Sequence, residues 1–190
     1  MAMKINGVDG TFNVPRVVKD YLFVKFDRSM TAGMAIGPDK TVDVKIALEA
    51  AWKGVVQRSN QKPCNEYFKT LFRQKTLTEI INEGDIVLHR LEPKAGFGYS
   101  ILPEANTAGR DIGIDPSLFF DPSAAALVCT LIHELAHVGG ASTDAGAALP
   151  QAHAAEKALM SCSCQQQYRS NILGSIKGLT SGPDSGRRFV

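Results

Sequence analysis

A His-Glu-x-x-His pattern is the feature of this sequence with the clearest chemistry. His133, Glu134 and His137 form it, within the apolar run TLIHELAHV. On a helix, residues four apart lie on one face, so both imidazoles can bind the same ion. Two neutral imidazoles suit Zn²⁺ and leave a coordination position open for water. The metal would lower the pKa of that water, and Glu134 would take its proton and pass it to a leaving amine. The pattern therefore predicts zinc-dependent hydrolysis.

The surroundings of the motif favour a functional role. The chain has only four histidines, so a chance occurrence of this pattern is rare. The residues before it are apolar, and burying two imidazoles and a carboxylate among them without a metal or other partners would be costly. The alternative is a core helix whose histidines are hydrogen-bonded within the protein.

A zinc site of this type needs a third protein ligand, and three residues compete for the role. Glu156 lies on the next expected helix, where a carboxylate could be supplied from a neighbouring helix. His153 lies about one turn earlier on roughly the same face and would give a three-histidine site. Asp144 comes first, in the loop after the motif. All three side-chain types bind zinc, and the spacing leaves the choice open.

Helical periodicity predicts the elements that carry these residues. We expect the motif helix over Ser123–Val138, with Asp121-Pro122 at its start and Gly139-Gly140 at its end. Pro150 then opens a second helix, which we expect to run from Gln151 to about Tyr168.

The rest of the chain predicts a small sheet and further helices, so the expected fold class is α+β. We expect one domain over residues 1–173, with the sheet packed on the motif helix, and a loosely ordered Gly- and Ser-rich tail over 174–190. The expected strands are Tyr21–Phe26, Asp85–Leu91, Phe97–Leu102 and Asp111–Asp115. The expected helices are Val42–Val56 and, after an interruption at Pro63, Asn65–Phe72 and Thr76–Ile81.

Composition excludes several classes of protein. The chain has 190 residues, 44% of them hydrophobic, and a net charge of +2. This length and composition fit a folded domain with its own core. The low net charge and the 7% aromatic content argue against nucleic acid as a partner. No apolar run approaches the roughly 20 residues that span a bilayer, so no membrane span is expected.

The first residues and the cysteines bear on the working environment. Residues 1–13 lack the apolar run and cleavage site of a signal peptide, although a protein loaded directly into a secretion machine would need neither. The four cysteines do not form a disulfide-rich scaffold. One bridge, from Cys64 to Cys162 or Cys164, is expected if the protein works outside a reducing compartment.

Thr130–Gly140 resembles the active-site helix of zincin metallopeptidases. Arg110–Asp121, followed by that helix and an Asp-containing loop, is similar to the deuterolysin or lysine-specific metalloendopeptidase group. Related metallopeptidase domains occur in bacterial toxins and secretion-system effectors. The resemblance covers roughly residues 65–167 and implies a zincin-like domain with zinc bound by His133 and His137 and with Glu134 as base. Aspzincins follow their Asp with Tyr-Gly, whereas Asp144 is followed by Ala-Gly, which weakens its assignment as a ligand.

The resemblance also implies a substrate-binding edge and an oxyanion donor. In zincins the strand before the helix usually forms a sheet edge along which an extended substrate pairs. Here that strand would be Asp111–Asp115 or Phe97–Leu102, with an interior strand as the alternative. Tyr168, Tyr99 and His89 are the candidates for stabilising an oxyanion, with packing roles as the alternative.

These observations lead to one expected function and two alternatives. The expected function is a zinc metallopeptidase that cleaves polypeptides, delivered as a toxin or effector, for which secretion machinery and an immunity protein would be partners. The first alternative is an amidase acting on the peptide stems of peptidoglycan with the same site. The second is a zincin-shaped binding module without turnover, against which the presence of Glu134 argues.

Overall fold

The computed structural model describes eight segments of the chain, and every structural statement below concerns these. They are residues 3–10, 16–18, 21–31, 41–93, 104–105, 110–120, 124–141 and 154–164.

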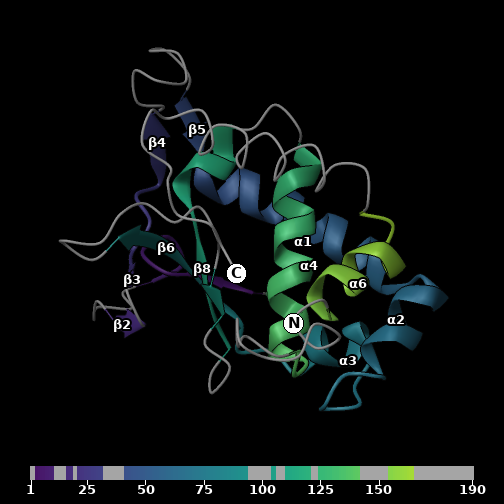
Figure 1. The fold of residues 1–190 in the computed structure, drawn as a ribbon. Coiled ribbons are helices and arrows are strands. Elements are labelled where there is room, and N and C mark those ends of the chain that lie inside the picture. The colour runs from purple at the N-terminus through teal and green to yellow at the C-terminus, as the bar shows by residue number, and fades with distance from the viewer. Residues whose placement is uncertain are drawn as a thin grey trace, which may run out of the picture.

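A six-stranded mixed sheet forms one layer of the molecule (Figure 1). Its order is β2-β3-β6-β8-β7, and β1 also pairs with β6. A separate two-stranded sheet joins β4 (Ser29–Thr31) to β5 (Thr41–Asp43). The strands of the large sheet are β1 (Lys4–Ile5), β2 (Arg16–Val18), β3 (Tyr21–Val24), β6 (Val87–Pro93), β7 (Glu104–Ala105) and β8 (Asp111–Ile114).

The central strand β6 has a different neighbour on each side. It runs parallel to β8, with Val87 opposite Asp111, and antiparallel to β3. Because side chains alternate along a strand, its two faces differ. Leu88 is buried in the main core, whereas Leu91 is buried with Phe23 in a second, small cluster on the other face.

The helices form the other layer. They are α1 (Val44–Ser59), α2 (Lys62–Phe68), α3 (Leu77–Asn82), the 3₁₀ helix η1 (Pro116–Phe120), α4 (Ala124–Val138) and α6 (Ala154–Ser161). Helix starts follow capping rules: the Asp43 side chain accepts a hydrogen bond from the backbone N–H of Ile46, and Thr76 forms a capping box with Glu79.

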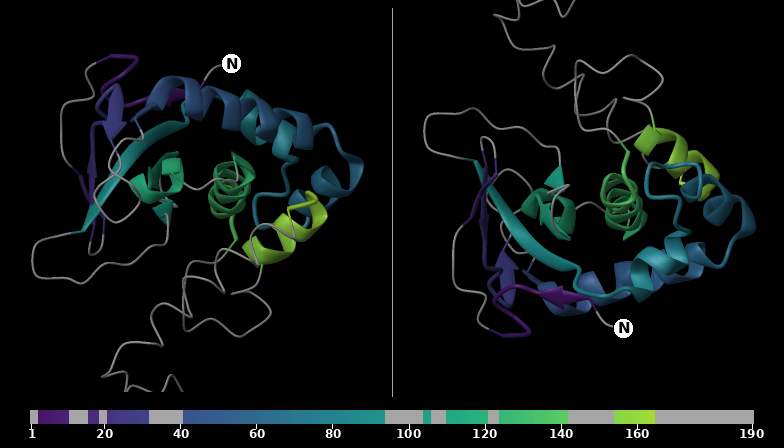
Figure 2. Two further views of the ribbon diagram at one scale, coloured as in Figure 1. Left: turned by 90° about the horizontal axis from the view of Figure 1, so that it is seen from above. Right: turned by 90° about the horizontal axis from the view of Figure 1, so that it is seen from below.

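Helix α4 lies in the middle of the molecule. Seen end-on in Figure 2, it stands between the sheet and an arc formed by α1, α2 and α6. Helix α1 approaches it closely at Gly54, where a Cβ atom would lie 2.8 Å from Cγ2 of Val128. A glycine at this position therefore lets the two helices come close together. No helix among the described residues is long and apolar enough to cross a membrane.

The expected α+β class is confirmed, and so are the predicted strands that correspond to β3, β6 and β8. The helices predicted over Val42–Val56, Thr76–Ile81 and Ser123–Val138 correspond to α1, α3 and α4. The expected strand at Phe97–Leu102, the residues Asp121 to Ser123 and the tail over 174–190 lie outside the described residues.

Two details of the sequence interpretation are wrong. The helix expected over Asn65–Phe72, after an interruption at Pro63, runs from Lys62 to Phe68 with Pro63 in its first turn, where its missing N–H costs nothing. The second helix ends at Ser161 rather than near Tyr168, and Ser163 just after it has a left-handed φ of 60°. Of the two positions left open for the strand at Asp111–Asp115, the interior one is correct, because β7 pairs with β8 on the side away from β6.

Candidate metal centre

The two motif histidines are the only partly exposed residues in an otherwise buried stretch of α4. From Ala126 to Gly139, every residue is buried except His133 and His137, which are half-buried. They lie one turn apart on the same face of the helix. Access to this stretch of the helix is therefore restricted to the two imidazoles.

The two imidazoles are arranged as ligands of one ion would be. Their Nε2 atoms are 3.2 Å apart, and their rings meet edge to face at an interplanar angle of 75°. Two nitrogen ligands at zinc distance on a tetrahedral ion lie about 3.3 Å apart. In this structure the two nitrogen atoms form a hydrogen bond with each other, and their separation is also the one that two ligands of a zinc ion would have.

The end of α4 fixes the tautomer of His137. Its Nδ1 lies 3.1 Å from the carbonyl oxygen of Ala141, which can only accept, so Nδ1 carries the proton and Nε2 keeps its lone pair. Ala141 is held by its own N–H, which donates to the Ala136 oxygen at 2.9 Å. The turn requires a glycine at position 140, because φ is +99° there and a Cβ would lie 2.7 Å from that of Phe72.

Burial sets the charge of His133. Desolvation, and after it the neighbouring His137, lowers the pKa of His133 to about 3. The ring is therefore neutral near pH 7, as a metal ligand must be. The Glu134 side chain is fully buried, and its Oε1 lies 4.0 Å from Nε2 of His133. A carboxylate thus lies beside the nitrogen atoms that would hold the metal.

The third ligand stays a prediction. Among the described residues, no three His, Cys, Asp or Glu side chains gather closely enough to hold a metal, so Glu156 does not join the two imidazoles in this structure. His153 and Asp144 lie outside the described residues. Glu156 is half-buried in the first turn of α6, and its Oε2 is buried without a hydrogen-bond partner in the described part of the chain.

Tyr67 connects α2 to the start of α6. Its hydroxyl donates to the carbonyl oxygen of Ala154 at 2.7 Å. Burial, and after it the charge of Glu156, raises the pKa of Tyr67. Tyr67 and Ala154 were not among the sequence candidates, because a contact between residues 87 positions apart leaves no periodic pattern in the sequence.

Several contacts place the first turn of α6 toward the motif end of α4. The segment after α2 touches the end of α4, where the Arg73 N–H donates to the Gly139 oxygen at 3.1 Å. The far end of α6 lies beside the first half of α4, where Sγ of Cys129 is 3.8 Å from the oxygen of Cys164. Tyr67 holds the first residue of α6, Ala154, so α6 runs antiparallel to α4. The first turn of α6 therefore lies toward the end of α4 that carries the motif.

His89 is not part of this site. Its Nδ1 lies 2.9 Å from Nδ2 of Asn6, and its Nε2 lies 3.0 Å from Oδ1 of Asp111. Its ring stacks on Phe23, on the face of β6 opposite to Leu88. The packing role is therefore the correct one, and His89 is removed from the oxyanion candidates. Tyr99 and Tyr168 lie outside the described residues.

Comparison with protein-family models, with curated proteins and with solved structures finds no match for this chain. The interpretation of the site therefore depends on the motif and its geometry.

Proposed function

We propose that this chain is a zinc metallopeptidase with a zincin-like domain, which hydrolyses peptide bonds in a polypeptide substrate. The observation that carries the proposal is the 3.2 Å separation of the two Nε2 atoms of His133 and His137, with the Glu134 carboxylate beside them. A core helix has no need to bring two imidazole nitrogens together at its one accessible position and to bury a carboxylate next to them.

Each residue of the motif has a separate task. His133 and His137 hold the metal through Nε2, and the Ala141 carbonyl keeps His137 in the tautomer that this needs. Zinc bound there would polarise a substrate carbonyl and lower the pKa of a water molecule. A carboxylate oxygen of Glu134 takes the proton from the attacking water and delivers it to the nitrogen of the leaving amine.

The third ligand comes from the chain between Asp144 and Glu156. The sequence supports Glu156 and the preceding His153 over Asp144, because Ala-Gly follows Asp144 where the aspzincin pattern has Tyr-Gly. A shift of a side chain or of the helix start on metal binding would bring the carboxylate of Glu156 to the imidazoles, and its buried, unpartnered oxygen makes such a shift inexpensive.

We also propose that the protein works outside a reducing compartment. The Cys64–Cys162 disulfide supports it, because such bonds persist in oxidising surroundings. An exported toxin or effector would work there, with secretion machinery and an immunity protein as partners.

The test combines zinc content with hydrolysis. Purified protein should hold about one zinc per chain after dialysis, measured by elemental analysis. It should cleave an unfolded polypeptide, with peptidoglycan stem peptides as the second substrate tested. Glu134→Gln should keep the zinc and lose roughly 10²–10⁴-fold in rate, because Gln cannot take a proton.

The same variant is the control for a contaminating protease, since it is purified identically. Cleavage of stem peptides alone would make the protein an amidase. Equal rates for Glu134→Gln and the parent, or a parent that ignores added zinc, would end the proposal.

A further inference from the structure

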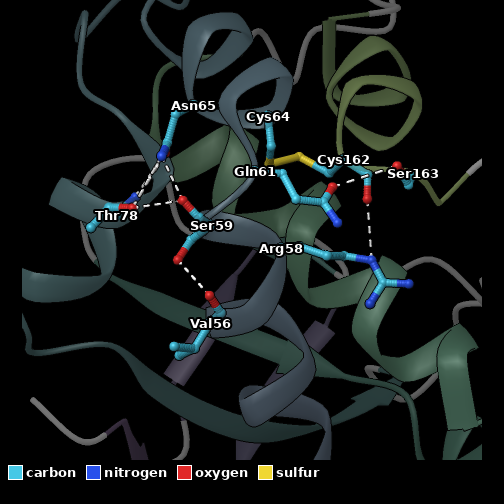
Figure 3. Close-up of a disulfide and its surroundings, with 9 residues drawn as sticks. All are labelled: Val56, Arg58, Ser59, Gln61, Cys64, Asn65, Thr78, Cys162 and Ser163. Atoms are coloured by element: carbon cyan, nitrogen blue, oxygen red, sulfur yellow. Dashed lines mark hydrogen bonds between the residues drawn. A yellow bond between two sulfur atoms is a disulfide. The ribbon is translucent and has the colours of Figure 1, made fainter.

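All four cysteines of the chain meet at the C-terminal end of α6. Cys162 is bonded to Cys64 in α2, which lies 98 positions earlier in the chain (Figure 3). The other two, Cys129 in α4 and Cys164, are free thiols, and both are buried. The structure thus contains one bridge and, two residues further along the chain, a second pair of thiols from different elements.

Cys129 contacts the backbone of Cys164: its Sγ donates to the carbonyl oxygen of Cys164 at 3.8 Å. The two thiols also influence each other, which raises the pKa of Cys129 and lowers that of Cys164. The two cysteines are therefore neighbours where α4 meets the end of α6.

The backbone and a cation hold Cys164 in this position. Its N–H donates to the Leu159 oxygen at 2.8 Å, after a left-handed turn at Ser163. Arg58 of α1 donates from Nε to the Cys162 oxygen at 3.1 Å, as Figure 3 shows, and its charge also favours a thiolate at Cys164. The backbone at Cys162–Cys164 is thus held by α6 and α1, independently of the contact with Cys129.

We propose that Cys129 and Cys164 form a second disulfide when the chain folds in contact with a small-molecule disulfide such as oxidised glutathione. The bond joins α4 to the end of α6, one turn before His133. This inference is independent of the proposed hydrolytic function, because it needs neither a metal nor a substrate.

The chemistry is two thiol–disulfide exchanges. The thiolate of one cysteine of the pair attacks a sulfur of glutathione disulfide, which forms a mixed disulfide and releases one glutathione thiolate. The thiolate of the other cysteine then attacks the sulfur of the first, and a second glutathione thiolate leaves. The protein loses two electrons and two protons, and glutathione disulfide is reduced to two thiols. Because both sulfurs are buried in the folded chain, the first exchange takes place before the end of α6 closes over α4.

The test is a count of thiols in the full chain. Protein refolded in a buffer of oxidised and reduced glutathione is denatured in the presence of N-ethylmaleimide and weighed by mass spectrometry. We expect no added maleimide, and a peptide pair joined through Cys129 and Cys164 after digestion without reduction. Two maleimides, on Cys129 and Cys164, would overturn the proposal, and so would any bridge from either residue to Cys64 or Cys162.

Two single variants test the pairing. Cys129→Ser and Cys164→Ser should each retain one glutathione on the remaining cysteine of the pair, because no second thiol resolves the mixed disulfide. A remaining cysteine that instead forms a bond to Cys64 or Cys162 would overturn the pairing. If either variant fails to fold, the thiol count of the parent still decides whether the bond forms.

Discussion

The two halves of α4 lie in different surroundings. The first half is buried from Ala126 onward: Val128 lies against Gly54 of α1, and Cys129 against the end of α6. The second half carries the polar residues of the motif, and its two imidazoles are half-buried. Apolar and cysteine contacts therefore surround one half, while the other brings two imidazole nitrogens within 3.2 Å of each other.

This difference indicates that the first half of α4 positions the helix and that the second half would bind the metal. Close packing and cysteine contacts determine where α4 lies, and they do so one turn away from the residues that would do chemistry. The imidazoles are positioned by the bond from His137 to Ala141 and by the hydrogen bond between their own Nε2 atoms. Changes in the first half should therefore affect stability, and changes in the second half should affect metal binding.

The largest effect should come from removing an imidazole. His137→Ala leaves too few protein ligands, so zinc affinity should fall by more than the roughly 10–100-fold typical of residues that only orient a ligand. Competition with a chromophoric chelator measures it. The matched change in the first half is Cys129→Ala, which should lower the unfolding midpoint and keep one zinc per chain. If His137→Ala still bound one zinc per chain, the proposed difference in function between the two halves of α4 would be wrong.

The next effect concerns the third ligand. Glu156→Ala, His153→Ala and Asp144→Ala should differ in zinc affinity, and we expect the greatest loss for Glu156, a similar one for His153 and the least for Asp144. Replacing a residue that binds the metal directly should lower the zinc affinity by more than about 100-fold. If only Asp144→Ala releases the zinc, the loop supplies the ligand, as the aspzincin resemblance implies. Retention of zinc by all three variants would show that the ligand lies elsewhere.

A smaller effect is expected where α4 ends. Gly140→Ala places a Cβ in a left-handed conformation and against Phe72, which should cost about 1–3 kcal/mol in the free energy of unfolding. Urea denaturation measures the cost. Zinc affinity should fall as well, because the same turn presents the Ala141 carbonyl to His137. A destabilised variant with unchanged zinc affinity would show that this carbonyl does not position the ring.

The smallest effect should follow from Tyr67→Phe. It removes the hydrogen bond to Ala154, worth about 1 kcal/mol, and retains the ring. The unfolding free energy should fall by that amount while zinc stays at one per chain. Since the start of α6 would be less firmly held, zinc affinity should weaken only if the third ligand comes from this turn. Tyr67→Phe therefore distinguishes a ligand on α6 from one in the preceding loop.

Local patterns predicted much of the fold and part of the candidate site. The motif helix and the strand at Asp111 were evident because their periodicity or capping is contained in neighbouring residues. The position of β8 inside the sheet could not be predicted in this way, since it depends on pairing with β7. The role of His89 depends on Asn6, 83 positions away, and that of Tyr67 on Ala154, and no sequence pattern encodes such contacts.

The Cys64–Cys162 bond closes a ring in the chain, and every residue proposed for the metal centre, from His133 to Glu156, lies inside that ring. A protease that cuts once between the two cysteines opens the ring without separating the pieces. The two fragments stay joined through the sulfur atoms, and the core that surrounds α4 can hold them in register. A chain of this design would withstand a single cut in surroundings rich in proteases, and reduction of the bond would be needed before the pieces could part.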